Sequence, residues 1–125
     1  LGDVYKRQDG IDIHFIQEKG SGSNPKPLLL NHGWPGSIVE FLNIIDQLAH
    51  PEKYGGKEED GFDVIVPSLP GYGFSGRPSR PIGPRKMAAI FNSLWLPNNL
   101  DSLIHTSKSL LIINLLSSIE QIIYL

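Results

Sequence analysis

A short apolar run followed by a turn rich in glycine and proline constrains the fold of this chain more than any other feature. Leu28-Leu29-Leu30 is a continuous apolar run, typical of a strand covered on both faces, and Asn31-His32-Gly33-Trp34-Pro35-Gly36 follows it directly. Ser37 and Glu40 then form a capping-box pattern, which predicts the start of a helix. A strand therefore leads through one tight turn into a helix.

The helix and the strand after it complete a βαβ unit. Apolar residues recur at three- and four-residue spacing from Ile38 to Ala49, so one face of the helix can pack on a sheet. Residues 51–61 are polar and contain glycine, which predicts a surface loop, and Phe62-Asp63-Val64-Ile65-Val66 predicts a second buried strand. A βαβ unit requires parallel strands and a right-handed crossover.

Two further elements extend this unit. Ile11-Asp12-Ile13-His14-Phe15 alternates apolar and polar residues, which predicts a half-buried strand with His14 partly exposed. The apolar spacing within residues 84–95 predicts a second helix that covers the sheet. Residues 1–8 begin with Leu1 rather than Met and carry no fold prediction. We therefore expect about three strands and two helices within residues 9–95.

Composition limits the classes of protein to consider. The chain has 125 residues, 40% of them hydrophobic, and a formal net charge of −2, which describes one globular domain. The small negative charge argues against nucleic-acid binding, and no stretch predicts a membrane span. The absence of cysteine excludes disulfides and thiol chemistry and fits a reducing compartment. We therefore expect a soluble, cytoplasmic protein.

The turn after the first buried strand is suited to aiming backbone N–H groups at one point. Gly33 and Gly36 permit a close approach of the backbone to a ligand and a positive φ, and Pro35 fixes the bend, with a cis peptide bond as one option. A preorganised N–H aimed at a developing oxyanion contributes about 3 kcal/mol. A purely structural turn with no catalytic role is the alternative that these residues leave open.

A second glycine-rich stretch follows the next strand. Pro67-Ser68-Leu69-Pro70-Gly71-Tyr72-Gly73-Phe74-Ser75 comes directly after the strand that ends near Val66. Because the carboxyl ends of parallel strands meet at one edge of a sheet, we expect this stretch to lie beside the first turn. Gly71, Gly73 and Gly76 imitate a dinucleotide fingerprint, but prolines flank them and no helix opens there, so no nucleotide site is predicted.

These two motifs, in this order, carry a resemblance to a known family. His32-Gly33-Trp34-Pro35-Gly36-Ser37 and the later run from Asp63 to Ser75 are similar to segments of the epoxide hydrolases of the α/β-hydrolase fold, most of all the microsomal and juvenile-hormone type. The resemblance covers residues 9–95 and implies the N-terminal part of a hydrolase core. The implied fold class is α/β, a partial α/β-hydrolase fold with a mostly parallel sheet and flanking helices.

The resemblance also implies a reaction. An aspartate attacks an epoxide carbon, paired lid tyrosines protonate the ring oxygen, and a histidine-acid pair activates water to hydrolyse the ester, which releases a vicinal diol. By this likeness, the Trp34 N–H is one oxyanion donor, the Trp34 ring walls the pocket, and His32, Gly33, Pro35 and Gly36 support the turn and the pocket. The partners are a small epoxide and water, and no cofactor or metal is implied.

The chain departs from the family pattern after residue 95. The family continues into a strand and a G-x-D-x-G nucleophile elbow, but residues 96–125 contain no glycine. We assign none of the missing roles to Asp101, His105 or Tyr124. We interpret residues 96–125 as a divergent tail that arises from a reading-frame error or a truncation before the elbow, and we expect the chain alone to be inactive.

Two other functions remain open on the sequence alone. A haloalkane dehalogenase or a serine esterase uses the same HGxP turn, and the residue at the missing elbow would separate them from an epoxide hydrolase. A non-catalytic truncated interaction module is an alternative of a different class. The sequence makes no prediction of the oligomeric state.

Overall fold

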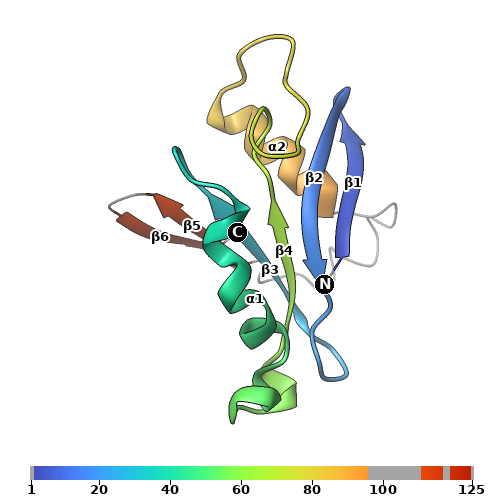
Figure 1. Cartoon of the computed structure of the whole chain (residues 1–125), viewed down its shortest axis with the longest axis vertical. Coiled ribbons are helices and arrows are strands. Elements are labelled where there is room, and N and C mark those ends of the chain that lie inside the picture. The colour runs from blue at the N-terminus through green and yellow to red at the C-terminus, as the bar shows by residue number, and fades with distance from the viewer. Residues whose placement is uncertain (1, 96–110, 117–118, 125) are drawn as a thin grey trace.

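The protein is a twisted mixed sheet with one helix on each face (Figure 1). A computed structural model of the chain describes residues 2–95, 111–116 and 119–124, with side chains up to residue 91. Its strands are β1 (Gly2–Gln8), β2 (Ile11–Glu18), β3 (Lys26–His32), β4 (Phe62–Pro67), β5 (Leu111–Leu116) and β6 (Ile119–Tyr124). Its helical elements are η1 (Ile38–Phe41), α1 (Leu42–Ala49), η2 (Pro51–Tyr54), η3 (Glu58–Asp60) and α2 (Pro84–Trp95).

The strand order confirms the predicted βαβ unit. The sheet runs β1-β2-β4-β3-β5-β6, and β3 pairs in parallel with both β4 and β5. The other three pairings are antiparallel, so the sheet is mixed and the expectation of a mostly parallel sheet is wrong, because β1, β2 and β6 join their neighbours in the antiparallel sense. The carboxyl ends of β3 and β4 therefore lie side by side at one edge, as a parallel pairing requires.

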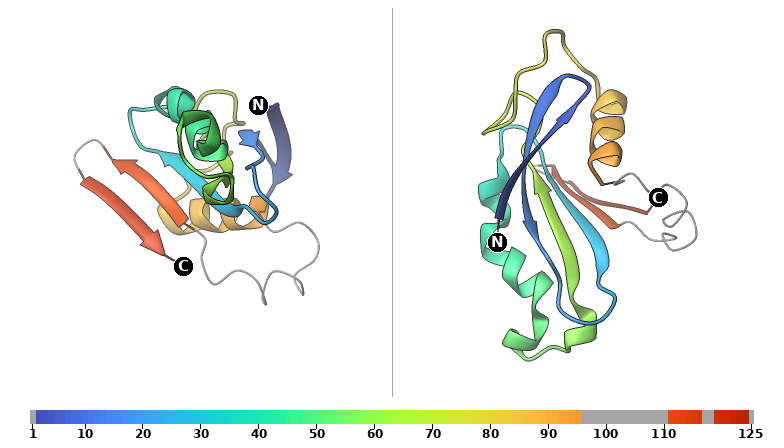
Figure 2. Two further views of the ribbon diagram at one scale, coloured as in Figure 1. Left: turned by 90° about the horizontal axis from the view of Figure 1, so that it is seen from below. Right: turned by 90° about the vertical axis from the view of Figure 1, so that its right-hand side faces the viewer.

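Alternation along the strands divides the core between the two faces. Neighbouring side chains of a strand point to opposite sides, so each of the central strands serves both helices. Figure 2 shows α1 against one face of the sheet and α2 against the other. The α1 face buries Ile16, Leu28, Leu30, Ile38, Phe41, Ile45, Ala49, Val64 and Val66. The α2 face buries Ile13, Phe15, Leu29, Ile65, Leu69, Ile90 and Phe91.

The three strands expected within residues 9–95 are β2, β3 and β4, and three further strands lie outside that range. Residues 2–8, for which no structure was predicted, form β1 and pair antiparallel with β2. The connecting Asp9 and Gly10 have φ of 50° and 78°, the two left-handed residues of a tight hairpin turn. Asp-Gly between two strands is a hairpin signal, so this pairing could have been predicted from the sequence. Two more strands, β5 and β6, lie within residues 96–125.

The predicted helices are confirmed with altered ends. The first begins as the 3₁₀ turn η1 and becomes α-helical at Leu42, whose side chain is exposed although its apolar character placed it on the packed face. The predicted surface loop 51–61 is exposed and contains the short turns η2 and η3. Among the described residues, no helix combines the length and apolar character needed to cross a bilayer.

Candidate functional site

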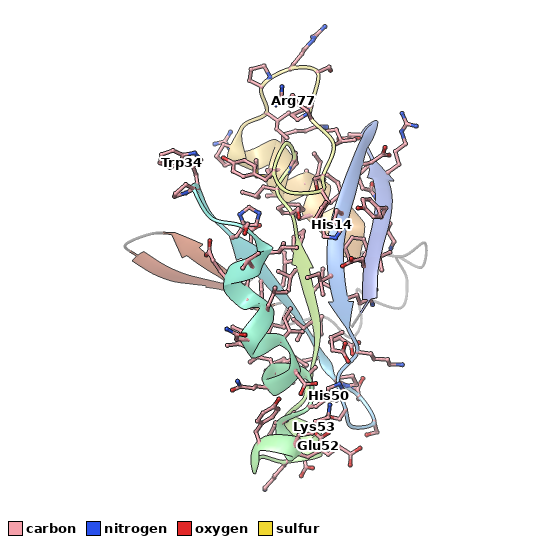
Figure 3. The ribbon with its side chains drawn as sticks, in the orientation of Figure 1. His14, Trp34, His50, Glu52, Lys53 and Arg77 are labelled. Carbon is pink, nitrogen blue, oxygen red and sulfur yellow. The ribbon has the colours of Figure 1, made fainter. Side chains whose placement is uncertain are left out.

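The turn from β3 into η1 is closed by its own backbone. The Gly36 N–H donates to the Gly33 carbonyl oxygen at 2.8 Å, and the Trp34–Pro35 peptide bond is cis, the isomer that the sequence left open. Figure 3 shows Trp34 at the tip of this turn, pointing away from the sheet. Its side chain is 73% exposed. The turn therefore presents its backbone at the edge of the sheet where β3 ends.

His32, the last residue of β3, holds this turn from inside. Its imidazole is 1% exposed; Nδ1 lies 3.2 Å from the Gly33 carbonyl oxygen, and Nε2 lies 3.1 Å from the Leu69 amide nitrogen. One neutral tautomer satisfies both contacts, with the proton on Nδ1 donated to Gly33 and the lone pair of Nε2 accepting from Leu69. A neutral His32 thus ties the turn to the loop that follows β4.

The anchored carbonyl fixes the direction of the next N–H. The Gly33 C=O and the Trp34 N–H belong to one planar trans peptide group, so they point in opposite directions. Because Gly36 and His32 both hold the Gly33 oxygen, the Trp34 N–H has a defined direction. This N–H donates no hydrogen bond in the part of the chain that the structure describes. A fixed, unpaired N–H is the group that an oxyanion needs.

The second predicted motif folds into a compact loop beside the turn. Gly71 and Gly73 have φ of 84° and 49°, the left-handed region that favours glycine. The Leu69 N–H donates to His32, and the rings of Tyr72 and His32 meet edge to face with centroids 5.6 Å apart. The expectation that the two motifs meet at one edge of the sheet is confirmed.

Glycine is required at position 36 by the helix cap. The Ser37 N–H donates to the Glu40 carboxylate at 3.0 Å, and the Ser37 hydroxyl oxygen accepts from the Val39 N–H at 3.3 Å, which confirms the predicted capping box. A Cβ at Gly36 would overlap that carboxylate. The positive φ that glycine permits is not used at Gly33 or Gly36, because the turn closes without a left-handed residue.

His14 is buried, so the prediction of a partly exposed residue is wrong. It is 1% exposed because β1 and the loop after β4 cover it, with the rings of Tyr5 and Phe74 at centroid distances of 5.2 and 5.1 Å. Its Nδ1 lies 2.9 Å from Oγ of the buried Ser68. No pattern within residues 11–15 indicates this contact, because the burial of His14 depends on β1 and on the distant loop after β4.

The other clustered polar residues lie far from the turn. Figure 3 shows His50, Glu52 and Lys53 at the end of the molecule opposite Trp34. His50 is the C-cap of α1, and its Nε2 lies 2.9 Å from a carboxylate oxygen of Glu18. This contact joins the end of α1 to β2, so its role is structural.

Asp46 is among the carboxyls in this distant region that have a displaced pKa. Asp46 accepts hydrogen bonds from the Tyr54 hydroxyl at 2.7 Å and from the Lys53 ammonium at 2.9 Å. These two bonds, the one from Tyr54 above all, hold the pKa of Asp46 below its ordinary value. The acidic run Glu58-Glu59-Asp60 is exposed, as predicted for solvated surface. None of these groups reaches the turn that carries Trp34.

A metal site does not emerge from the described residues. Within residues 2–95 and the two short later strands, no three histidine, aspartate or glutamate side chains are grouped so that they could hold an ion. Asp101 and His105 lie outside the described residues, and Tyr124 is described only through the backbone of β6. The candidate site therefore consists of the turn, the loop beside it and the histidine that joins them.

The strand order and the turn that follows β3 together define a class. A strand antiparallel to its neighbours beside a parallel βαβ unit, with an N–H-presenting turn at the strand end, is the pattern of an α/β-hydrolase. The profile described as "alpha/beta hydrolase fold" matches residues 26–125, and the chain belongs to this family. A second profile, described as "Epoxide hydrolase N terminus", matches residues 3–41.

Individual relatives agree with the predicted resemblance. Epoxide hydrolase 1 of Oryctolagus cuniculus is 51% identical over 76 residues, which cover 58% of this chain and 17% of that protein. Juvenile hormone epoxide hydrolase of Bombyx mori is 40% identical over 91 residues, which cover 68% of this chain and 19% of that protein. The chain spans about a fifth of the length of the curated relatives it matches.

A solved structure agrees with the fold. The epoxide hydrolase of Aspergillus niger superposes with a TM-score of 0.67 at 28% sequence identity, over 90% of this chain and 27% of that one. The predicted fold class and the resemblance to epoxide hydrolases are both confirmed.

Proposed function

We propose that this chain supplies the N-terminal part of an epoxide hydrolase core, which converts an epoxide and water into a vicinal diol through an alkyl-enzyme ester. The proposal is supported by the likeness of residues 3–41 to the N terminus of epoxide hydrolases and by the rabbit and silkworm relatives. No position in residues 9–95 matches a nucleophile elbow. We therefore assign three groups to the sequence that follows the matched segment in the relatives. They are the attacking aspartate, the acids that protonate the ring oxygen and the base that activates water.

The backbone N–H of Trp34 is the oxyanion donor in this proposal. Hydrolysis of the alkyl-enzyme ester passes through a tetrahedral oxyanion, which a preorganised N–H stabilises. The observation that supports the role is that the Trp34 N–H has no hydrogen-bond partner among the described residues, while the carbonyl of its peptide group is held twice, by Gly36 and by His32. Gly33 and Pro35 complete the supporting turn, and the exposed Trp34 ring walls the substrate pocket.

Other reactions could use the same donor. A haloalkane dehalogenase hydrolyses an alkyl-enzyme ester too, and a serine esterase needs an oxyanion donor for its acyl intermediate. The N-terminal likeness of residues 3–41 favours the epoxide hydrolase among these. The proposed chemistry runs on side chains, backbone N–H groups and water, without cofactor or metal.

The proposal is tested in a chimera. Residues 2–95 replace the matched segment of the Bombyx mori juvenile hormone epoxide hydrolase, and conversion of a terminal epoxide to its diol is followed by chromatography, with the parent enzyme as control. Diol formation within about tenfold of the parent supports the proposal. A chimera that has the circular dichroism of the parent and forms no diol contradicts it, and so favours a structural turn or an interaction module.

The divergent tail is a separate proposal with its own test. We propose that residues 96–125 depart from the family sequence because of a reading-frame error or a truncation before the elbow. Translation of the coding DNA in its other two frames beyond codon 95 should then yield a strand followed by G-x-D-x-G. A G-x-S-x-G elbow would favour the serine esterase, and the absence of any elbow in all frames would contradict a reading-frame error.

A further inference from the structure

A buried polar cluster lies next to the candidate site, and the proposed reaction does not use it. His14 in the middle of β2 is enclosed between the rings of Tyr5 and Phe74, and Figure 3 shows it in the same half of the molecule as Trp34. A histidine and a serine that are both 1% exposed, His14 and Ser68, are in contact there. Burial of polar groups is unfavourable unless they are hydrogen-bonded, so this cluster has to be explained.

Hydrogen bonds from His14 hold the loop after β4 at two serines. The side-chain Nδ1 lies 2.9 Å from Ser68 Oγ, and the His14 carbonyl accepts from the Ser68 N–H at 2.9 Å. The His14 N–H donates to Ser75 Oγ at 3.0 Å, and the Ser75 hydroxyl in turn donates to the Ser68 carbonyl at 2.7 Å. One strand residue thus fixes both ends of the loop.

The same loop holds the turn that presents Trp34. Ser68 immediately precedes Leu69, whose N–H donates to Nε2 of His32 at 3.1 Å. His32 then donates to the Gly33 carbonyl, which sets the direction of the Trp34 N–H. The contacts therefore form a continuous path from β2 through the loop to the turn.

The surroundings of the second ring nitrogen favour one tautomer of His14. Among the described residues, its Nε2 has no hydrogen-bond partner, and the exposed Asp3 carboxylate lies 3.5 Å away. A proton on Nε2 faces that carboxylate and leaves the lone pair of Nδ1 to accept from the Ser68 hydroxyl. The Ser68 hydroxyl makes no other hydrogen bond among the described residues, so this arrangement satisfies both the hydroxyl and Nδ1.

We propose that His14 is a positioning residue for the oxyanion turn, acting through Ser68, Leu69 and His32. This inference rests on the proposed function, because it gives His14 a role in the placement of the Trp34 N–H. A positioning role for His14 differs from a packing role in one respect. Packing requires only a ring of the right size between Tyr5 and Phe74, whereas positioning requires a hydrogen-bonding group where Nδ1 lies.

Three variants of the full chain separate these roles. His14→Phe keeps a ring and removes both nitrogens, and His14→Asn keeps a polar group near the place of Nδ1. Ser68→Ala leaves the histidine intact and removes its partner hydroxyl. The measurement is amide hydrogen exchange of Leu69 by NMR on ¹⁵N-labelled protein, with the tautomer of His32 read from its ring ¹⁵N shifts.

We expect exchange of the Leu69 amide to accelerate about tenfold in His14→Phe and in Ser68→Ala, as for the loss of one buried hydrogen bond. In His14→Asn it should stay within about threefold of the unmodified chain, and exchange at Ile45 in α1 should be unchanged in all three. The His32 signals should show a mixture of tautomers only in the first two variants.

Equal Leu69 exchange in the unmodified chain and in His14→Phe would overturn the inference, as would equal acceleration in His14→Phe and His14→Asn. If His14→Phe does not fold, Ser68→Ala decides, because unchanged Leu69 exchange in that variant also overturns it. None of these readouts involves substrate. Failure of the chimera to form diol would therefore contradict the proposed function and leave this result standing.

Discussion

In the proposed function, a single peptide group carries most of the chemistry that this chain would contribute. The Gly33 carbonyl accepts from the Gly36 N–H and from the His32 ring, so the Trp34 N–H on the same peptide plane is fixed without being consumed. Preorganisation of this kind is useful because the donor does not have to reorient when negative charge develops. For the proposed oxyanion contact, the residues that hold the Gly33 carbonyl are therefore more important than the tryptophan side chain.

The first prediction concerns His32. His32→Leu leaves the buried Leu69 N–H without a partner, which should cost about 1–3 kcal/mol of unfolding free energy. His32→Gln offers an oxygen near the place of Nε2 and should lose about 1 kcal/mol less. Urea denaturation of the two variants measures the difference. Equal losses would mean that the bond to Leu69 contributes nothing to stability.

The second prediction concerns Gly36. Gly36→Ala forces the Glu40 carboxylate away from the Ser37 N–H, and the loss of half of the capping box should cost about 1 kcal/mol. Gly2→Ala is the control, because a Cβ there meets nothing within 4 Å and Gly2 caps no helix. Thermal denaturation should show a lower Tm for Gly36→Ala only. Equal Tm changes in both variants would contradict this account of Gly36.

The sequence predicted the residues of the turn better than it predicted their contacts. The motif places His32, Gly33, Trp34, Pro35 and Gly36 between a strand and a helix, and the structure has them there. The Leu69 N–H that pairs with His32 comes from 37 positions along the chain, and no local pattern indicates such a pairing. The burial of His14 was missed for the same reason, since it depends on contacts between distant segments.

At the scale of elements, the end of α1 opposite the turn is held by charged side chains. Asp46 on α1 accepts from Tyr54 and Lys53 of η2, so the helix and the short turn that follows it are joined on the surface. Because Asp46 accepts these bonds as a carboxylate, they stabilise the folded chain while Asp46 is ionised and weaken when it becomes protonated.

The third prediction follows from the lowered pKa of Asp46. A carboxyl whose pKa is lower in the folded state contributes stability above its unfolded pKa, and this contribution is lost as the pH falls through the folded value. Tyr54→Phe removes the main cause of the shift. The variant should therefore have a smaller free energy of unfolding than the unmodified chain at pH 6. The difference between the two should shrink as the pH falls below about 3.8. Denaturant titrations at pH 6 and at a series of lower pH values test this. A gap that is constant with pH would contradict it.

Periodic elements were predictable, and irregular ones were not. The apolar spacing of residues 38–49 and 84–95 located two helices because each has one face on the sheet. The start of the first helix as a 3₁₀ turn was not predicted, since its four residues have the same apolar spacing in either helix type. The strand β1 was predictable from the hairpin signal of Asp9-Gly10, although residues 2–8 show no strand pattern strong enough to stand alone.

At the scale of the whole molecule, the two faces of the sheet are covered by one helix each, and the turn and loop meet where β3 and β4 end (Figures 1 and 2). The chain spans about a fifth of its curated relatives, so the proposed reaction needs groups from the rest of such a protein.

The fourth prediction is that the purified chain forms no diol from a terminal epoxide. Residues 9–95 contain an oxyanion donor in our account and no matched nucleophile, and a donor alone cannot open the ring. The assay compares the chain with the full-length Bombyx mori relative at equal concentration. Turnover by the chain at a rate near that of the relative would show that the nucleophile had been wrongly assigned to later sequence.

The central claim, that the Trp34 N–H stabilises the oxyanion, is tested most directly by its removal in the active chimera. Incorporation of the α-hydroxy analogue of tryptophan at position 34 replaces that N–H by an oxygen and keeps the indole ring. In a single-turnover experiment, ring opening should proceed at the parent rate while hydrolysis of the alkyl-enzyme ester slows by about 10²–10³. Ester hydrolysis at an unchanged rate in the substituted chimera would contradict the claim.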